Sequence, residues 1–310
     1  MTRNGDSPDE VFESHASTEA SVSDPLVSVL TPSFNQVRWL SDNLRSVRLQ
    51  SYPHIEHVVM DGASTDGSVD LLRSASGRVV WRSEPDAGQS AALNKAFAAS
   101  SGEIIGWLNS DDAYFSTAAV ESAVAYLDRH PDVDLVYGHS AYVNAEGLVL
   151  HLMWVPACGR WWFLRQDFIS QPTVFLRRRA IQGAFVDESF HFAMDYELWL
   201  RLLDQGCRFQ RIDAVLAVER VQPGRKTLQM EDVWREDTDR LGRTYAVVTG
   251  GLGTRMVFSA LGIASRFAGV RLLPAALADD LAFAAQPTTH ADLLRRQIAT
   301  RRSRMPFGSA

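Results

Sequence analysis

The residues of this sequence that are best suited to catalysis or to cation binding are carboxylates. They stand directly after short apolar runs. Asp111 and Asp112 follow the run EIIGWLN at 103–109 and a serine, and Asp61 follows the run IEHVVM at 55–60. Adjacent acids at the end of a buried strand repel each other and resist desolvation, so water, a cation or hydrogen-bond donors must compensate their charge. The plainer interpretation is a solvated turn, in which Asp and Asn side chains bond nearby backbone.

A further carboxylate, Asp195, begins the apolar stripe of an expected helix. The segment HFAMDYELWLRLLDQG covers residues 191–206, and its positions i, i+3, i+4 and i+7 are Asp195, Leu198, Trp199 and Leu202. An acid at the start of such a stripe is either a partner of the helix dipole or a carboxylate directed into a pocket. Helix physics alone favours neither interpretation over the other.

The elements that must position these acids alternate along the chain. From residue 26, short β-branched runs alternate with segments whose apolar residues recur at helical spacing. The expected strands are 26–31, 55–60, 78–83, 103–109 and 133–138, and the expected helices are 37–47, 68–75, 89–100 and 117–130. Asn35 is the expected cap of the first helix. This order predicts an α/β fold with a mostly parallel sheet flanked by helices.

Polar residues follow three of the expected strands: TPSFN closes the first, DGASTDG the second and NSDD the fourth. Sheets of this kind bind ligands at the carboxyl ends of their strands. We therefore expect the three polar segments to converge on one edge, which a turn-only interpretation of the acids does not explain.

Composition and charge exclude several classes of protein. The chain has 310 residues and a net charge of −6, of which −5 lies in residues 1–24. The remainder is near neutral, which argues against a nucleic-acid partner. Residues 1–24 are predicted to be a disordered acidic tail without the features of a signal peptide. Two cysteines, Cys158 and Cys207, make no disulfide framework, so a reducing, cytoplasmic location is expected.

Residues 229–310 are expected to form a helical C-terminal extension. The longest apolar stretch, 257–285, is interrupted by charges and a proline, so it is too short to span a membrane. The arginine-rich run at 295–304 would suit peripheral contact with an anionic membrane at its inner face, or would be an ordinary solvated helix face.

The ordered series SVLTPSFNQ, VVMDGASTDGS, DAGQSAALNKAF, GEIIGWLNSDDAY, SQPTVFLRR and MDYELWLRL resembles the family 2 glycosyltransferases of the GT-A fold. Each piece alone is unspecific, whereas their order and spacing together are specific. The resemblance implies a Rossmann-like nucleotide-diphospho-sugar transferase domain at 25–228, between the tail and the extension.

The same resemblance implies a donor site at the expected edge. Asp61 matches the acid that bonds the nucleotide base, and Gly62 stands where the family often has a second acid. The residues implied to bind the donor are Thr31, Pro32, Ser33, Phe34, Asp61, Ser64, Gln89, Asn94, Lys95, Asn109, Ser110, Asp112, Arg220 and Lys226.

The metal and the general base are also implied by the resemblance. In the family's Asp-x-Asp motif Asn109 replaces the first acid, which leaves Asp111 as the expected ligand of Mg²⁺ or Mn²⁺. Such a cation stabilises a leaving diphosphate, and hard cations prefer oxygen ligands. Asp195 matches the acid that deprotonates an acceptor hydroxyl in a single, inverting displacement. Gln222 stands where a His is common, in the loop that carries Arg220 and Lys226.

These expectations combine into an inverting, metal-dependent glycosyltransferase. Its donor would be a UDP-, dTDP- or GDP-sugar, and its acceptor a glycan, a lipid-linked molecule or a small molecule, in the synthesis of cell-surface polysaccharide or glycolipid. Asn109 and Gln222 motivate an alternative, a non-catalytic nucleotide-sugar binder or partner subunit.

Two other motifs have competing interpretations. The segment GGLGTRM at 250–256 resembles the signature of sugar-phosphate nucleotidylyltransferases, but it comes after the predicted sheet is complete and is better explained as a helix break. Trp161, Trp162 and Phe163 suit stacking on a sugar, although core packing is favoured for at least two of the three.

Overall fold

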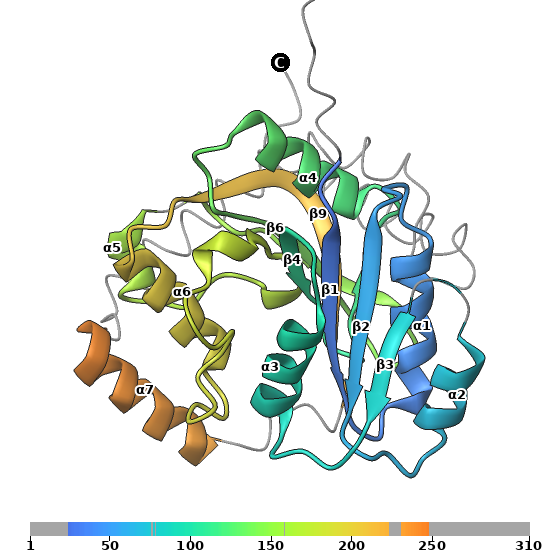
Figure 1. Cartoon of the computed structure of the whole chain (residues 1–310). Helices are drawn as coiled ribbons and strands as arrows, with labels where there is room; N and C mark the ends of the chain where they lie inside the picture. Colours follow the sequence, from blue (N-terminus) through green and yellow to red (C-terminus); the bar gives the residue numbers. More distant parts are fainter. Residues whose placement is uncertain (1–23, 76, 78, 158, 223–230, 248–310) are drawn as a thin grey trace, which may run out of the picture.

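The computed structural model describes residues 24–222 and 231–247, except residues 76, 78 and 158. In this part of the chain, strands and helices first alternate and then give way to a more irregular half (Figure 1). The elements of the first half are β1 (Val27–Ser33), α1 (Val37–Arg48), β2 (Ile55–Asp61), α2 (Ser68–Ser74), β3 (Val79–Ser83), α3 (Gln89–Ala99), β4 (Ile104–Trp107), β5 (Ala113–Tyr114) and α4 (Ala119–Arg129). Those of the second half are β6 (Leu135–Val143), β7 (Val149–Met153), α5 (Arg160–Phe163), the 3₁₀ helices η1 (Gln171–Thr173) and η2 (Arg178–Ala180) on either side of β8 (Phe175–Arg177), α6 (Met194–Asp204), β9 (Phe209–Arg220) and α7 (Glu231–Tyr245).

One sheet organises the fold, with the strand order β3-β2-β1-β4-β8-β6-β9-β5 and with β7 beside β6. The pairs β1–β2, β2–β3 and β1–β4 are parallel, as the alternation of strands and helices predicts. Beyond β4 the sheet is mixed, because β8 runs antiparallel to β4 and β6, and β5 antiparallel to β9. Antiparallel neighbours need no helical crossover, so the helix periodicity of the sequence does not predict this half.

Helices cover both faces of the sheet, and the alternation of side chains along β1 follows this division. Val29 packs on the face covered by α4, whereas Leu30 packs on the face covered by α3 and α6. The fold is therefore the expected α/β arrangement, with α1 and α2 beside β2 and β3 in Figure 1.

The start of α1 differs from the expectation. Asn35 has a positive φ of 52° and no capping hydrogen bond; its Oδ1 instead accepts from the backbone N–H of Thr65 at 2.9 Å. Asp66 takes the capping role from another part of the chain, because its Oδ2 accepts from the N–H of Val37 at 2.9 Å. A cap supplied across 29 residues is not visible as a local sequence signal.

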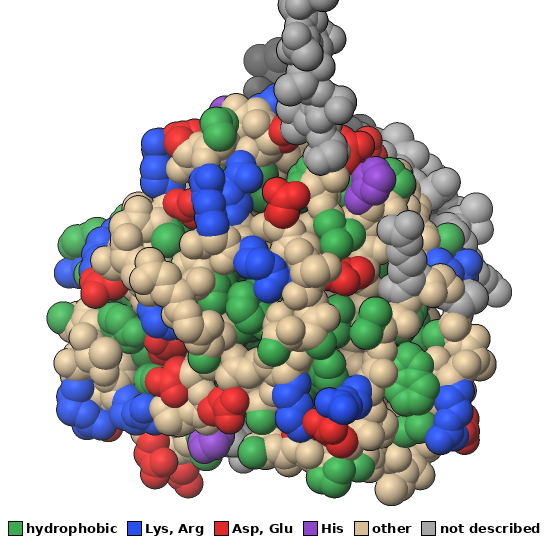
Figure 2. Space-filling view, viewed as in Figure 1, with side chains coloured by type: hydrophobic (Ala, Val, Ile, Leu, Met, Phe, Trp, Pro, Cys, Tyr) green, Lys and Arg blue, Asp and Glu red, His purple; other side chains and the backbone are tan. Residues whose placement is uncertain are grey.

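Helix α7, which falls within the expected C-terminal extension, packs against the region that precedes α6. The buried Asp237 accepts hydrogen bonds from the backbone N–H groups of His191, Phe192 and Ala193 at 2.7–3.1 Å. The tail at 1–23, the segment GGLGTRM, the stretch 257–285 and the basic run at 295–304 lie outside the described residues. No described helix is both long and apolar enough to cross a membrane. On the face shown in Figure 2, basic and acidic side chains are interspersed.

Candidate active site

The carboxyl ends of three parallel strands meet at one edge, as the sequence predicts. The register places Ser33 beside Asp61, and Asp61 beside Ser83. On the other side of β1, Leu30 pairs with Trp107, the last residue of β4, so the segment 108–112 leaves the sheet at the same edge. The polar segments after β1, β2 and β4 therefore border one another.

Asp61 is buried at this edge and holds the turn that follows β2. Its side chain is surrounded by donors: Ser64 donates through both its backbone N–H at 2.9 Å and its hydroxyl at 2.5 Å, and the hydroxyl of Ser83 donates at 2.6 Å. The residue is 1% exposed. Three hydrogen bonds satisfy most of the acceptor capacity of a carboxylate. The contact of Asp61 with the nucleotide base stays a prediction.

Asn109 connects four side chains from different elements. Its Oδ1 accepts from Gln89 Nε2 at 2.8 Å and from Trp107 Nε1 at 2.9 Å, while its Nδ2 donates to Gln171 Oε1 at 2.9 Å and to Asp112 Oδ2 at 3.4 Å. A carboxylate here would lose both donations and would repel Asp112. The departure of Asn109 from an acidic motif therefore has a local structural reason.

Asp111 and Asp112 differ in their surroundings. Asp112 is buried, and its Oδ1 accepts from the backbone N–H of Arg220 at 3.1 Å. Asp111 is half-buried, and its Oδ2 accepts from Gln222 Nε2 at 3.3 Å. The structure thus brings Gln222 to the carboxylate that the sequence singles out as the metal ligand.

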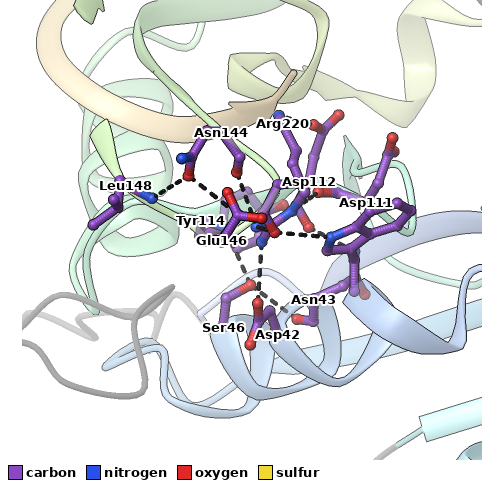
Figure 3. Close-up of polar contacts among 12 residues, drawn as sticks. Asp42, Asn43, Ser46, Asp111, Asp112, Tyr114, Asn144, Glu146, Leu148 and Arg220 are labelled. Carbon is purple, nitrogen blue, oxygen red and sulfur yellow. Dashed lines mark hydrogen bonds and ion pairs between the residues drawn. The ribbon is translucent and has the colours of Figure 1, made fainter. Parts of the chain in front are cut away.

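Arg220, at the end of β9, binds the 109–112 loop (Figure 3). Its Nε donates to the carbonyl oxygen of Asp111 at 3.1 Å, and its Nη1 donates to the carbonyl oxygens of Asn144 and Ala145 at 3.4 and 3.2 Å. Its Nη2 forms an ion pair with Asp42 at 3.0 Å, and its side chain is 3% exposed. The guanidinium is therefore engaged inside the protein, and its expected contact with a diphosphate stays a prediction.

Helix α1 also shapes the loop. Asn43 Nδ2 donates to the carbonyl oxygens of Asn109 at 2.9 Å and of Asp112 at 3.2 Å, and Ser46 Oγ accepts from the N–H of Tyr114 at 3.1 Å. This role of α1 was not predicted from the sequence. The available signal was a polar residue, Asn43, three positions after Leu40 on the apolar face of the predicted helix.

Asp195 lies in the first turn of α6, and its Oδ1 accepts from the backbone N–H of Tyr196 at 2.8 Å. Desolvation raises the pKa of Asp195 to about 6, the nearby N–H groups oppose the rise, and the negative charge of Glu219 adds to it. A carboxyl with this pKa accepts a proton more readily at neutral pH than an ordinary aspartate. Asp195 thus lies in the first turn of α6, as the helix-dipole interpretation predicts, while a carboxylate directed into a pocket stays a prediction.

Asp167 and Glu219 were not found by sequence reasoning. Desolvation and the charge of Asp195 raise the pKa of Asp167 well above its usual range, so Asp167 and Asp195 titrate as an interacting pair. Glu219 is buried and accepts from the hydroxyls of Ser140 at 3.1 Å and Ser170 at 2.5 Å. No motif marks either acid, because each comes from an irregular or strand segment distant in sequence.

Two series of contacts connect the surroundings of Asp195 with the 109–112 loop. At the start of α3, Gln89 bonds Asn109, and the next residue, Ser90, contacts Met194 Sδ at 3.2 Å. At the end of β9, Glu219 influences Asp195 electrostatically, and the next residue, Arg220, bonds Asp112.

The remaining predicted donor residues divide between buried supports and surface positions. Thr31, Pro32, Ser33 and Ser110 are buried, and Thr31 Oγ1 donates to the carbonyl oxygen of Leu108 at 2.8 Å. Phe34 is 61% exposed. Ser64, besides its bonds to Asp61, accepts from the N–H of Asn35 at 2.7 Å.

Asn94 and Lys95 do not point at the 109–112 loop. Asn94 joins α3 to the backbone of Val186 and to Glu188, and Lys95 Nζ pairs with Glu84 at 2.8 Å. Both line an open depression of about 600 Å³ beside α3. Lys226 lies outside the described residues.

The aromatic group at 161–163 divides as the sequence predicts. Phe163 is 1% exposed, and Trp162 packs against the core, which confirms core packing for two of the three. Trp161 is 52% exposed and stacks under the guanidinium of Arg165, 3.6 Å from its ring centre.

Solved structures share this architecture at low sequence identity. TarS residues 1–349 of S. aureus, in complex with UDP-GlcNAc, has a TM-score of 0.54 at 15% identity, with 91% of this chain and 93% of that chain covered. The mannosyltransferase PcManGT of Pyrobaculum calidifontis, in complex with GDP-Man and Mn²⁺, has a TM-score of 0.56 at 22% identity, with 90% and 81% covered. The fold is that of the GT-A sugar-nucleotide transferases.

The family model "Glycosyl transferase family 2" matches residues 28–194, more than half of the chain, and the chain belongs to this family. An uncharacterized glycosyltransferase of Mycobacterium tuberculosis is 39% identical over 37% of this chain and 44% of its own length. TuaG of Bacillus subtilis, named for teichuronic acid biosynthesis, is 39% identical over 29% of this chain and 37% of its own length. The chain thus spans less than half the length of these two relatives.

Proposed function

We propose that this chain transfers a sugar from a nucleotide diphosphate to an acceptor hydroxyl with inversion at the anomeric carbon. The observation that carries the proposal is the raised pKa of Asp195, whose neighbour Met194 contacts Ser90, the residue after the Gln89 that bonds Asn109. Family membership supports the reaction class.

The chemistry follows from one base and a leaving diphosphate. Asp195 accepts the proton of the acceptor hydroxyl as its oxygen attacks the anomeric carbon, and the bond to the donor phosphate breaks with its electron pair leaving on the nucleoside diphosphate. A single displacement inverts the configuration. It requires no covalent nucleophile on the protein.

The donors present at the loop fit a hard divalent cation. Asp111 offers a half-buried carboxylate, the buried carboxylate of Asp112 follows it in the chain, and Gln222 donates from its Nε2 to Asp111. Mg²⁺ and Mn²⁺ typically take one or two carboxylates and complete their shell with phosphate and water. Bound between Asp111 and a diphosphate, the cation would neutralise the charge that develops on the leaving group.

The relatives support the proposed substrate class. PcManGT binds GDP-Man with Mn²⁺, TarS binds UDP-GlcNAc, and TuaG is named for teichuronic acid biosynthesis. A nucleotide sugar as donor and a growing cell-surface polysaccharide or glycolipid as acceptor therefore agree with the site.

The proposal is tested by measuring the release of nucleoside diphosphate. The assay contains UDP-, dTDP- or GDP-sugars, Mn²⁺ and a broad panel of acceptors. Asp195→Asn should lower the turnover rate by about 10²-fold or more, because the base is lost, while nucleotide binding persists. Asp204→Asn, at the exposed end of the same helix, is the matched control and should retain activity. Binding without turnover for the unchanged protein across the whole panel would favour a non-catalytic binder.

A further inference from the structure

The short segment 190–194, which leads into α6, is held between two other helices, α3 and α7. On the α3 side, the hydroxyl of Ser90 donates to the carbonyl oxygen of Phe190 at 3.1 Å and contacts Met194 Sδ at 3.2 Å. Asp195 is the next residue along the chain and lies in the first turn of α6. The backbone position of Asp195 therefore depends on how this segment is fixed.

On the α7 side, one carboxylate oxygen meets three consecutive backbone N–H groups of the segment. Asp237 Oδ2 accepts from His191 at 3.1 Å, from Phe192 at 2.7 Å and from Ala193 at 3.0 Å. Asp237 is 3% exposed. N–H groups at the start of a helix have no acceptor within the helix, and bonds to an ionised acceptor are stronger than bonds to a neutral one. Asp237 thus fixes the conformation of the turn that begins α6.

Helix α7 is itself attached to the rest of the protein beyond this carboxylate. Arg240 Nη1 donates to the carbonyl oxygen of Ser189 at 2.7 Å, and the hydroxyl of Tyr245 donates to Glu197 on α6 at 2.7 Å. Leu241 is fully buried in the same core as the apolar side of α6. A buried carboxylate on a helix packed in this way is a fixed point against which the start of α6 is placed.

The side chain of Asp195 follows the start of α6, because its Oδ1 accepts from the backbone N–H of Tyr196 at 2.8 Å. A general base must lie within hydrogen-bond reach of the proton that it accepts, and a misplacement of about 1 Å can lower a rate by about 10²-fold. The contacts of Asn109 and Asp111 described above come from other elements than α7. A change at Asp237 should therefore affect the step that needs the base more than the binding of the donor.

We infer that Asp237 is a positioning residue, which binds the three N–H groups before α6 and thereby sets where Asp195 stands relative to the acceptor hydroxyl. The inference rests on the proposed function, because Asp237 acts through the proposed base. Helix α7 lies beyond residues 28–194, which match the family model, so the family match does not assign this role.

Steady-state kinetics of the full chain test the inference with Asp237→Ala. The turnover rate kcat is expressed per protein that binds UDP or GDP in the presence of Mn²⁺, so that unfolded protein is not counted. Asp237→Ala should lower kcat by about 10- to 100-fold, while the dissociation constant of the nucleoside diphosphate stays within about twofold.

Two further variants separate positioning from a general structural effect. Asp237→Asn keeps an oxygen that accepts hydrogen bonds in a side chain of the same shape, so it should retain kcat to within about threefold. Asp239→Ala removes an exposed acid from the same helix and should change neither kcat nor nucleotide affinity.

Hydrogen exchange measures the same contact without turnover. In Asp237→Ala the backbone N–H groups of residues 191–193 should exchange at least about tenfold faster than in the unchanged protein, because they lose their acceptor. The N–H groups of α3 should keep their exchange rates, which shows that the change is local. Asp237→Asn and Asp239→Ala should resemble the unchanged protein.

The outcomes distinguish this inference from the proposed function. If Asp237→Ala keeps kcat, if it loses kcat and nucleotide affinity together, or if residues 191–193 keep their exchange rates, the assignment of Asp237 is wrong while the proposed function stands. The assignment is also wrong if Asp237→Asn loses as much kcat as Asp237→Ala. If the unchanged protein turns over no donor, the proposed function fails and the assignment fails with it.

Discussion

At the scale of single residues, neutral and charged side chains have distinct tasks in this site. Asn109 both donates and accepts, so it joins Gln89, Gln171 and Asp112 without adding charge beside the acids. Asp111 is left as the half-buried carboxylate of the loop. The local charge that a cation would balance is thereby concentrated at Asp111.

The pH dependence of turnover belongs to Asp195 and to Asp167, the acid with which it interacts. Because a general base must be deprotonated, the rate should fall as pH falls through about 6, the raised pKa of Asp195. Glu219→Gln removes a negative charge that disfavours ionisation of Asp195, so the pKa of Asp195 should decrease and the acidic limb of the pH–rate profile should move to lower pH. The Gln side chain keeps an oxygen that can accept from Ser140 and Ser170.

This prediction is checked by measuring pH–rate profiles of the unchanged protein and of Glu219→Gln at saturating donor. An acidic limb that stays in place or moves to higher pH in Glu219→Gln would show that Glu219 does not act on the base. A uniform loss of rate at every pH would indicate a structural effect only.

At the scale of elements, α1 and β9 hold the 109–112 loop from two sides. The ion pair between Asp42 on α1 and Arg220 on β9 joins them, with Arg220 buried and Asp42 one-third exposed. Asp42→Ala leaves a buried guanidinium with one partner fewer, which should cost about 1 to 3 kcal/mol of unfolding free energy.

An exposed ion pair is the matched control for this prediction. Asp70→Ala breaks the ion pair of Asp70 with Arg73, in which the side chains are 80% and 65% exposed, respectively. It should cost about 0 to 1 kcal/mol of unfolding free energy. Urea denaturation of both variants measures the difference. Equal losses would mean that the Asp42–Arg220 pair does not stabilise the loop beyond an ordinary surface contact.

The sequence predicted those elements whose cause is local. β1 to β4 and their helices follow from alternating apolar periodicity, and the convergence of the segments after β1, β2 and β4 follows from parallel pairing. The pairing of β5 with β9 and the ion pair of Asp42 with Arg220 join residues more than 100 positions apart. Such contacts are set by tertiary packing, and a single sequence carries no periodic signal for them.

The roles of the candidate site residues stay predictions, but the structure shows which of these residues are neighbours. Gln89, Asn109 and Asp112 are joined by hydrogen bonds and Gln222 bonds Asp111, whereas Asn94 and Lys95 line the surface beside α3. Asp167 and Glu219 gain their roles from neighbours that are remote in sequence. Their residue types alone do not distinguish them from ordinary surface acids.

At the scale of the whole molecule, the proposed function assigns the nucleotide to the parallel half of the sheet and the general base to Asp195 on α6. α7 is attached to the start of α6, because Asp237 accepts hydrogen bonds from the backbone just before that helix. The proposed function requires that the parallel half and Asp195 act on one bound donor.

The central claim, that the protein binds a nucleotide-sugar donor, is tested most directly by thermal unfolding. The measurement is made with and without Mn²⁺ in the presence of UDP-, dTDP- and GDP-sugars. We predict that at least one donor raises the melting temperature when Mn²⁺ is present; saturation at about 100 times Kd contributes about 2.7 kcal/mol, or several degrees for a domain of this size. Asp111→Ala should abolish the dependence on Mn²⁺. The account is contradicted if no donor stabilises the protein, or if Asp111→Ala responds to Mn²⁺ as the unchanged protein does.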